Sequence, residues 1–146
     1  FKKVNDTYGH QAGDQVLKSM VETVRRSIRS EIDWIARYGG EEFLVILLDT
    51  GLDDAMRQAE ELRTKVAELG IPHSTSTVAD HLTISSGVAC CTPNPTIVPE
   101  RLIIAADTAL YQAKSSGRNR LASAHCDKPG LVSDPSPATG EPRVKL

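Results

Sequence analysis

The sequence predicts an α/β domain of the ferredoxin-like β-α-β-β-α-β type, and three observations lead to this fold class. Apolar residues recur at helical spacing in three separate stretches. Two apolar strands flank the glycine pair Gly39-Gly40. The elements follow the order helix, strand, strand, helix, strand, helix and short strand. A domain of this type needs one more strand upstream of Phe1, so we expect the first strand to be missing from this fragment.

The polar stretch from Phe1 to Gly13 is expected to form an ordered loop that leads into a helix. From Gln15 onward, apolar residues recur at helical spacing as far as Ile28, which predicts the first helix. Arginines gather toward the end of this helix, where cations complement the helix dipole. Asp14 stands at the expected helix start, where an N-cap or first-turn carboxylate is favourable.

Gly39 and Gly40 lie between two apolar runs and predict a two-residue hairpin turn. A primed turn needs positive φ at both central positions, which glycine adopts without steric cost. The expected strands are Asp33–Tyr38 and Glu42–Leu48. The second strand is apolar on both of its faces, so we expect it to lie inside a sheet that is covered on both sides.

Two adjacent carboxylates, Glu41 and Glu42, follow the glycine pair. Mg²⁺ is commonly bound by one or two carboxylates together with substrate phosphates, so the pair is a candidate site for Mg²⁺ or Mn²⁺. A second interpretation is a tight turn followed by solvated acidic residues at a strand start, because such pairs are common on protein surfaces. This stretch alone leaves both interpretations open.

The second half of the chain predicts a helix, a strand, a helix and a short strand. The first of these helices begins at Asp53 and ends at Gly70. The other runs from about Pro99 to Ser115, and its proline suits the first helical turn. The expected strands are Leu82–Cys91 and Arg118–Ala122, and the segment Thr92–Pro99 is expected to be a loop.

Length and composition indicate one domain over residues 1–123 and a disordered tail or linker over residues 124–146, which is rich in Pro, Ser, Gly and charge. The formal net charge of -2, without a basic stripe, argues against a nucleic-acid partner. Three cysteines do not suggest a disulfide framework and favour reduced thiols in the cytoplasm. No apolar run approaches the roughly 20 residues that span a bilayer.

Five short motifs follow one another along the chain. They are Phe1-Lys2-x-x-Asn5-Asp6, Gly9-His10, Gly13-Asp14, Arg37-Tyr38-Gly39-Gly40-Glu41-Glu42-Phe43 and Tyr111-Gln112-Ala113-Lys114-x-x-Gly117-Arg118-Asn119. Together, at this spacing, they resemble the GGDEF family of diguanylate cyclases in its GGEEF form. The resemblance runs from Phe1 to about Leu121 and implies a fold similar to nucleotide cyclase and polymerase palm domains.

The resemblance implies an enzyme that condenses two GTP molecules into cyclic di-GMP and releases two pyrophosphates. Each protomer of a homodimer would hold one GTP, and the product would form where two sites face each other. The family's first metal-binding aspartate would fall just before Phe1, so we expect the parent protein to be active and this fragment to be inactive. An upstream sensor or transmembrane domain is expected in the parent, with this domain in the cytoplasm.

Two other functions remain open. The strongest alternative is a degenerate domain that binds GTP and regulates a partner without turnover. The third is a purely structural dimerisation domain, in which Glu41 and Glu42 would be replaceable.

The resemblance assigns roles residue by residue. Glu41 matches the family's metal-binding carboxylate and presumed general base, and Glu42 matches the second carboxylate near the metal. Asn5 and Asp14 match the pair that reads guanine, because an amide can contact ring acceptors and a carboxylate can accept from N1–H and the 2-amino group.

Lys2 matches the family's phosphate-contacting lysine and is taken as catalytic. Lys114 and Arg118 match the cations near the β- and γ-phosphates, although complementing the helix dipole is an alternative role. His10 matches a position that borders the substrate, and packing at the helix entry is its alternative role. The residues expected to bind GTP are therefore Asn5, His10, Asp14, Gly39, Gly40, Lys114 and Arg118.

One motif departs from the family. Many members bind their product at an Arg-x-x-Asp upstream of the hairpin. Here the aspartate is Asp33, but Ser30 holds the arginine position and Arg29 sits one residue early. One residue is about 100° around a helix, so we expect Arg29 to point elsewhere unless the backbone adjusts. We therefore expect a degenerate product-inhibition site and weak or absent inhibition by the product.

Overall fold

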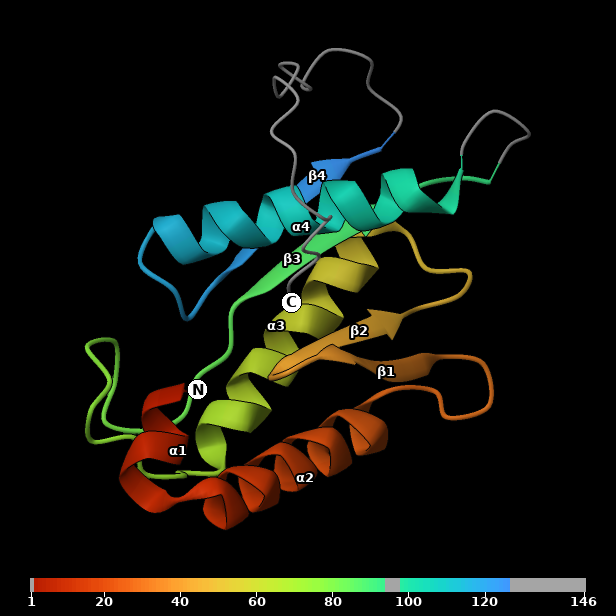
Figure 1. Ribbon diagram of the computed structural model, residues 1–146. Coiled ribbons are helices and arrows are strands. Elements are labelled where there is room, and N and C mark those ends of the chain that lie inside the picture. Colours follow the sequence, from red (N-terminus) through yellow and green to blue (C-terminus); the bar gives the residue numbers. More distant parts are fainter. Residues whose placement is uncertain (1, 94–97, 127–146) are drawn as a thin grey trace.

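The computed structural model describes residues 2–93 and 98–126, without the side chains of residues 2 and 3. Four helices and four strands occur within these residues (Figure 1). They are α1 (Lys2–Tyr8), α2 (His10–Ser27), β1 (Trp34–Gly39), β2 (Glu42–Ile46), α3 (Leu52–Glu68), β3 (Ser86–Cys90), α4 (Pro99–Ser115) and β4 (Leu121–His125). No helix in this part of the chain is long and apolar enough to cross a membrane.

The mixed α/β class is confirmed, and the strands of the described ranges form two sheets of two strands each. β1 and β2 are antiparallel, whereas β3 and β4 are parallel. In Figure 1, α2 lies along β1 and α4 lies along β3 and β4. A single sheet with an additional strand before Phe1 stays a prediction.

The N-terminal stretch is helical, so the prediction of a loop from Phe1 to Gly13 is wrong from residue 2 onward. α1 and α2 meet at Gly9, where a φ of 85° interrupts the helical path. Val4 is buried, and this tertiary contact stabilises a helix that its polar composition did not indicate. Gly9 is also the N-cap of α2, so Asp14 does not cap the helix as predicted and lies in its second turn.

β1 and β2 form the predicted hairpin, but its turn is shifted by one residue. Gly39 pairs with Glu42, and the turn consists of Gly40 and Glu41. Only Gly40 has a positive φ, at 55°, so the prediction of positive φ at both glycines is wrong. A positive φ at the first central position alone is the pattern of a type II′ turn. Glu41 consequently lies in the turn and not at the start of β2.

One face of β2 is covered and the other is open, contrary to the prediction that both faces are covered. Phe43 packs against the main hydrophobic cluster. On the opposite face, Ile46 is 43% exposed and its cross-strand partner Trp34 is 66% exposed. The buried members of the cluster are Leu17, Met20, Val66 and Leu82.

A close backbone contact at Gly87 holds α4 against β3. A Cβ atom at Gly87 would lie 2.0 Å from the carbonyl oxygen of Ala106 and 2.2 Å from the backbone nitrogen of Leu110. These distances leave no room for a side chain, so only glycine allows α4 to approach this closely. The position of the C-terminal end of α4 therefore depends on the strand beneath it.

The bounds of α4 agree with the prediction, α3 begins one residue earlier and ends two residues earlier than predicted, and both strands of the second sheet differ from the prediction. β3 begins at Ser86 rather than at Leu82. β4 begins at Leu121 because Arg118 and Asn119 have φ values of 62° and 46°, which an extended strand does not allow. Residues 94–97 of the predicted loop and 127–146 of the predicted tail lie outside the described residues.

Candidate functional site

The turn of the β1–β2 hairpin presents two carboxylates in different surroundings. Glu41 is exposed in the turn, whereas the Glu42 side chain, at the start of β2, is 14% exposed. Arg37 braces the turn, because its Nε donates a hydrogen bond of 2.7 Å to the carbonyl oxygen of Gly40. The sequence did not predict a role for Arg37, although its place in the strand that leads into the glycine pair was an available signal.

Glu42 meets Lys114 between the hairpin and α4. Glu42 Oε1 lies 4.0 Å from Lys114 Nζ, and the lysine side chain is 34% exposed. Lys114 belongs to the last turn of α4, the helix whose depth is set by the contact at Gly87. The structure thus brings one acidic and one basic member of the predicted site into contact.

Arg118 follows α4 in a loop that is anchored on both sides. Its backbone nitrogen donates to the carbonyl oxygen of Ala113 at 3.0 Å. The next backbone nitrogen, of Asn119, donates to Ser85 Oγ at 3.1 Å, and Arg63 Nη1 donates to Asn119 Oδ1 at 2.8 Å. These contacts fix the backbone, while the Arg118 side chain stays exposed to solvent just beyond Lys114.

The junction of α1 and α2 carries the other polar residues of the predicted site. Asn5 is half-buried on α1, and His10 and Asp14 are exposed on α2. The backbone nitrogen of Gly9 donates to the carbonyl oxygen of Asn5 at 2.9 Å, which closes the end of α1. Asp14 borders a shallow hollow of about 430 Å³. The hollow is lined by Gln11, Ala12, Asp14, Gln15 and Lys18.

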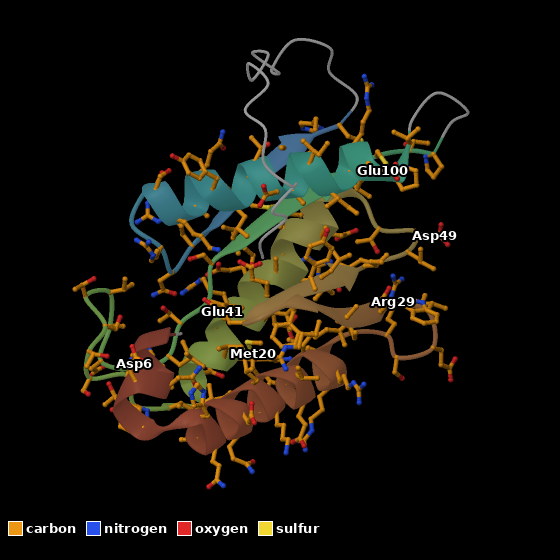
Figure 2. The ribbon with its side chains drawn as sticks, viewed as in Figure 1. Asp6, Met20, Arg29, Glu41, Asp49 and Glu100 are labelled. Carbon is orange, nitrogen blue, oxygen red and sulfur yellow. The ribbon has the colours of Figure 1, made fainter. Side chains whose placement is uncertain are left out.

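In Figure 1 the turn end of the β1–β2 hairpin points to the left, the side on which α1 and the C-terminal end of α4 lie. Figure 2 shows Glu41 and Asp6 toward this side, whereas Glu100, at the other end of α4, lies toward the opposite side. The contact between Glu42 and Lys114 shows that the turn and the end of α4 are neighbours. The Lys2 side chain lies outside the described residues, so its predicted role stays a prediction.

Glu41 and Glu42 suit a divalent cation whose coordination is completed by phosphate oxygens. Within the ranges that the structure describes, no group of three or more His, Cys, Asp or Glu side chains could hold a metal ion. A cation at Glu41 and Glu42 would therefore take its remaining ligands from groups other than the described His, Cys, Asp and Glu side chains.

Arg29 and Asp33 are in direct contact because the backbone leaves the helical path before Arg29, which is the exception that the prediction allowed. α2 ends at Ser27 and Ile28 is extended, which takes Arg29 off the helix. Arg29 Nε donates to Asp33 Oδ2 at 2.9 Å and Nη2 donates to Oδ1 at 2.7 Å. The side-chain hydrogen bond from Arg29 lowers the pKa of Asp33 to about 2. Both carboxylate oxygens of Asp33 are thus engaged within the domain.

Comparison with known proteins adds to this geometry. Residues 1–120 match the family described as "Diguanylate cyclase, GGDEF domain". Response regulator PleD of Caulobacter vibrioides is 46% identical over 121 residues, which cover 82% of this chain and 26% of PleD. The chain thus spans between a quarter and a third of the length of the curated relatives it matches.

Two solved structures have similar folds. The coiled coil and GGDEF domain of DgcB from Caulobacter crescentus, in complex with c-di-GMP, matches with a TM-score of 0.72 at 34% identity and covers 84% of this chain and 63% of that one. The active GGEEF domain of a diguanylate cyclase from Vibrio cholerae matches with a TM-score of 0.68 at 29% identity, covering 87% of this chain and 76% of that one.

Proposed function

The chain belongs to the GGDEF family of diguanylate cyclases, and we propose that its parent protein condenses two GTP molecules into cyclic di-GMP and two pyrophosphates. The observation that carries the proposal is the contact between Glu42 and Lys114. It brings the acidic turn, whose carboxylates suit a metal ion, next to the Lys114 ammonium group, which suits a phosphate. A triphosphate with its metal needs both at one place.

The proposed reaction joins the 3′-oxygen of one GTP to the α-phosphorus of the other and breaks the bond to the β-phosphate oxygen. Glu41, exposed in the turn, would accept the proton of the attacking hydroxyl. Lys114 and Arg118 would bind the oxygens of the departing pyrophosphate. A second attack of the same kind, in which the two nucleotides exchange roles, closes the ring and releases the second pyrophosphate. A cation held by Glu41 and Glu42 would supply further charge neutralisation on the phosphates when bound.

Base selection is proposed to depend on the junction of α1 and α2. Asp14 can accept hydrogen bonds from the N1–H and 2-amino groups of guanine, and the Asn5 amide can contact ring acceptors. The Asp14 carboxylate is exposed beside a hollow and is accessible to a ligand. Adenine has no N1–H and would leave the carboxylate without a donor.

The product contains two GMP units, and each domain would hold one GTP, so we propose that a homodimer is the active form. The chain spans a quarter of PleD, which leaves room for further segments in the parent. We propose that these include a sensor or membrane-spanning segment and that this domain works in the cytoplasm.

A second candidate function is GTP binding without turnover. It is favoured by the absence, within the described ranges, of any group of three or more side chains that could hold a metal ion. A domain with this donor set can bind a nucleotide and still hold the cation too weakly for rapid phosphoryl transfer. Binding and turnover must therefore be measured separately.

The test uses the purified full-length protein with GTP and Mg²⁺, and chromatography to quantify cyclic di-GMP. Loss of a general base typically costs about 10²–10⁴-fold in rate, so Glu41→Gln should lower turnover by that factor. Glu100→Gln is the matched control, because it removes a carboxylate at the far end of α4 and should keep turnover near wild type. Calorimetry with a non-hydrolysable GTP analogue measures binding separately.

Binding without turnover in the wild-type protein would favour the regulatory function. Turnover that Glu41→Gln leaves unchanged would contradict the proposed role of the turn. A protein that neither binds nor converts GTP would rule out both functions.

A further inference from the structure

The sequence contains three cysteines, and all of them lie where β3 and β4 end. Cys90 is the last residue of β3, Cys91 follows it, and Cys126 directly follows β4. None of the three cysteines forms a disulfide within the described residues, and all three are partly exposed. None of them belongs to the proposed GTP site. Because all three lie at the same end of the two strands, the register of the strands decides which two could react with each other.

The register of the parallel ladder answers this question. β3 and β4 pair from Ser86 with Leu121 to Cys90 with His125. The ladder ends with this pair, and its continuation by one residue on each strand would set Cys91 opposite Cys126. Neighbouring strands lie about 4.8 Å apart, and disulfides join residues whose Cα atoms are about 4.4–6.8 Å apart. The spacing of the ladder is therefore suitable for a disulfide between these two positions.

The faces of the strands agree with this pairing. Gly87 faces α4, because a Cβ there would meet the backbone of that helix. Side chains alternate along a strand, so Cys91 continues the face of Gly87 and Cys90 takes the other face. The Cys90 thiol does point away from α4, toward the carbonyl oxygen of Thr50 at 3.6 Å, beside the start of α3. Gly87 pairs with Ala122, so strand alternation carried one residue past β4 would place Cys126 on the same α4 face as Cys91.

The position of the Cys126 sulfur supports the same conclusion. Its Sγ donates to the carbonyl oxygen of Cys90 at 3.3 Å. This carbonyl belongs to the peptide bond that leads into Cys91. Standard backbone dimensions place the Cα of Cys91 within roughly 3 Å of that oxygen, so the Cys126 sulfur lies within about 6 Å of the Cα of Cys91.

We propose that Cys91 and Cys126 form a reversible disulfide that closes a ring around α4 and β4. The oxidant is a low-molecular-weight disulfide. One cysteine thiolate attacks a sulfur of this oxidant and releases the first small thiolate, which leaves a mixed disulfide. The second cysteine thiolate attacks the protein sulfur of the mixed disulfide and releases the second. Two protein thiols lose two protons and two electrons, and two small thiols gain them.

The ring would contain α4 and therefore Lys114, together with the loop that carries Arg118. A covalent link at the open end of the ladder restricts the separation of β4 from β3. Amide hydrogens of β4 are accordingly expected to exchange more slowly after oxidation. This inference concerns the thiols alone and does not depend on whether the domain turns over GTP.

The experiment exposes the purified protein to glutathione disulfide and maps tryptic peptides by mass spectrometry without reduction. Cys90 and Cys91 fall in one tryptic peptide, between Lys65 and Arg101, so variants must separate them. The expected result is one intramolecular link to Cys126 in the wild type and in Cys90→Ser, reversed by dithiothreitol. Cys91→Ser should abolish this link. A second measurement needs no variant: amide hydrogen exchange in β4 is compared between the oxidised and the reduced wild-type protein.

A link that forms through Cys90 and persists in Cys91→Ser would overturn the proposal. So would links that form only between two chains, or cysteines that remain fully alkylatable at an oxidant level that converts a free model thiol. Unchanged exchange of β4 in a protein shown to be linked would overturn the proposed restriction of the strand.

Discussion

Arg29, just beyond the end of α2, binds Asp33 through two guanidinium hydrogen bonds. Nε donates to Oδ2 at 2.9 Å and Nη2 donates to Oδ1 at 2.7 Å. The Asp33 side chain is fully buried, whereas that of Arg29 is 46% exposed. Arg29 Nη2 also donates to Thr50 Oγ1 at 3.0 Å. The pair therefore joins the end of α2 to the segment that follows β2.

We expect Asp33→Asn to lower the free energy of unfolding by about 1.5–3 kcal/mol, the usual contribution of a hydrogen bond to a charged group. The buried carboxylate accepts from Arg29 and from the backbone nitrogen of Leu48, and the amide cannot replace all of these contacts. Urea denaturation measures the loss. Glu22→Gln is the control, because its pair with Arg26 is exposed and should contribute less than about 1 kcal/mol. Equal losses in both variants would contradict this assignment.

The same pair predicts how stability depends on pH. The pKa of Asp33 is lowered from 3.8 to about 2, chiefly by the Arg29 hydrogen bond, so the folded state favours the charged form. Its contribution is therefore present above pH 3.8, the unfolded value, and is lost as the pH falls through about 2. At about 1.4 kcal/mol per pKa unit, lowering the pKa from 3.8 to about 2 contributes roughly 2–3 kcal/mol.

The measurement is denaturation of the wild type and of Asp33→Asn at a series of pH values from about 6 to about 2.5. This series covers most of the range in which carboxylates titrate. The difference between the two proteins should shrink as the pH falls. A difference that stays constant across the series would show that ionisation of Asp33 does not contribute.

We expect weak or absent binding of cyclic di-GMP outside the active site. Asp33 already accepts from Arg29, and Ser30 offers a hydroxyl where a product-binding arginine would be needed. Calorimetry with cyclic di-GMP on the wild-type protein is the measurement. Sub-micromolar binding that disappears in Asp33→Asn and persists in Glu31→Gln, an exposed neighbour, would contradict the expectation.

The glycine pair of the turn should respond unequally to substitution. Gly40 has a φ of 55°, where an alanine costs about 1–2 kcal/mol, although a Cβ there would meet no atom within 4 Å. Gly39 is equally open but has ordinary strand geometry, so Gly39→Ala should change stability by less than about 1 kcal/mol. Thermal denaturation of the two single variants checks this, and each is the control for the other. Equal losses would contradict the assignment of the turn to Gly40 and Glu41.

Periodicity and turn chemistry predicted the elements whose signals are local. Pro99 marked the start of α4, and the structure confirms the predicted bounds of that helix. The glycine pair predicted a hairpin, which the structure confirms with its turn shifted by one residue. α1 was missed because its stability depends on burying Val4, a tertiary contact that a polar segment does not reveal. The start of β4 was misplaced because left-handed φ values at Arg118 and Asn119, both non-glycine residues, have no reliable sequence signal.

The site was predicted in parts and not as an arrangement. Motif spacing identified Glu42 and Lys114 separately, but only the packing of α4 shows that they meet. The contact of Arg29 with Asp33 was not predicted, because it depends on the backbone leaving the helix after Ser27, which the apolar spacing does not show. Bracing of the turn by Arg37 depends on a side-chain conformation that no spacing encodes.

Gly87 touches no proposed substrate, yet α4 rests on it backbone to backbone, and this helix delivers Lys114 to the acidic turn. A methyl group at this position would lift the helix and move the lysine without altering a single charge. A genetic screen for weakened nucleotide affinity should therefore recover substitutions in the middle of a strand, remote from every ligand-contacting side chain. Such a variant would have the weakened affinity of a binding-site defect, although its cause would be a larger distance between α4 and β3.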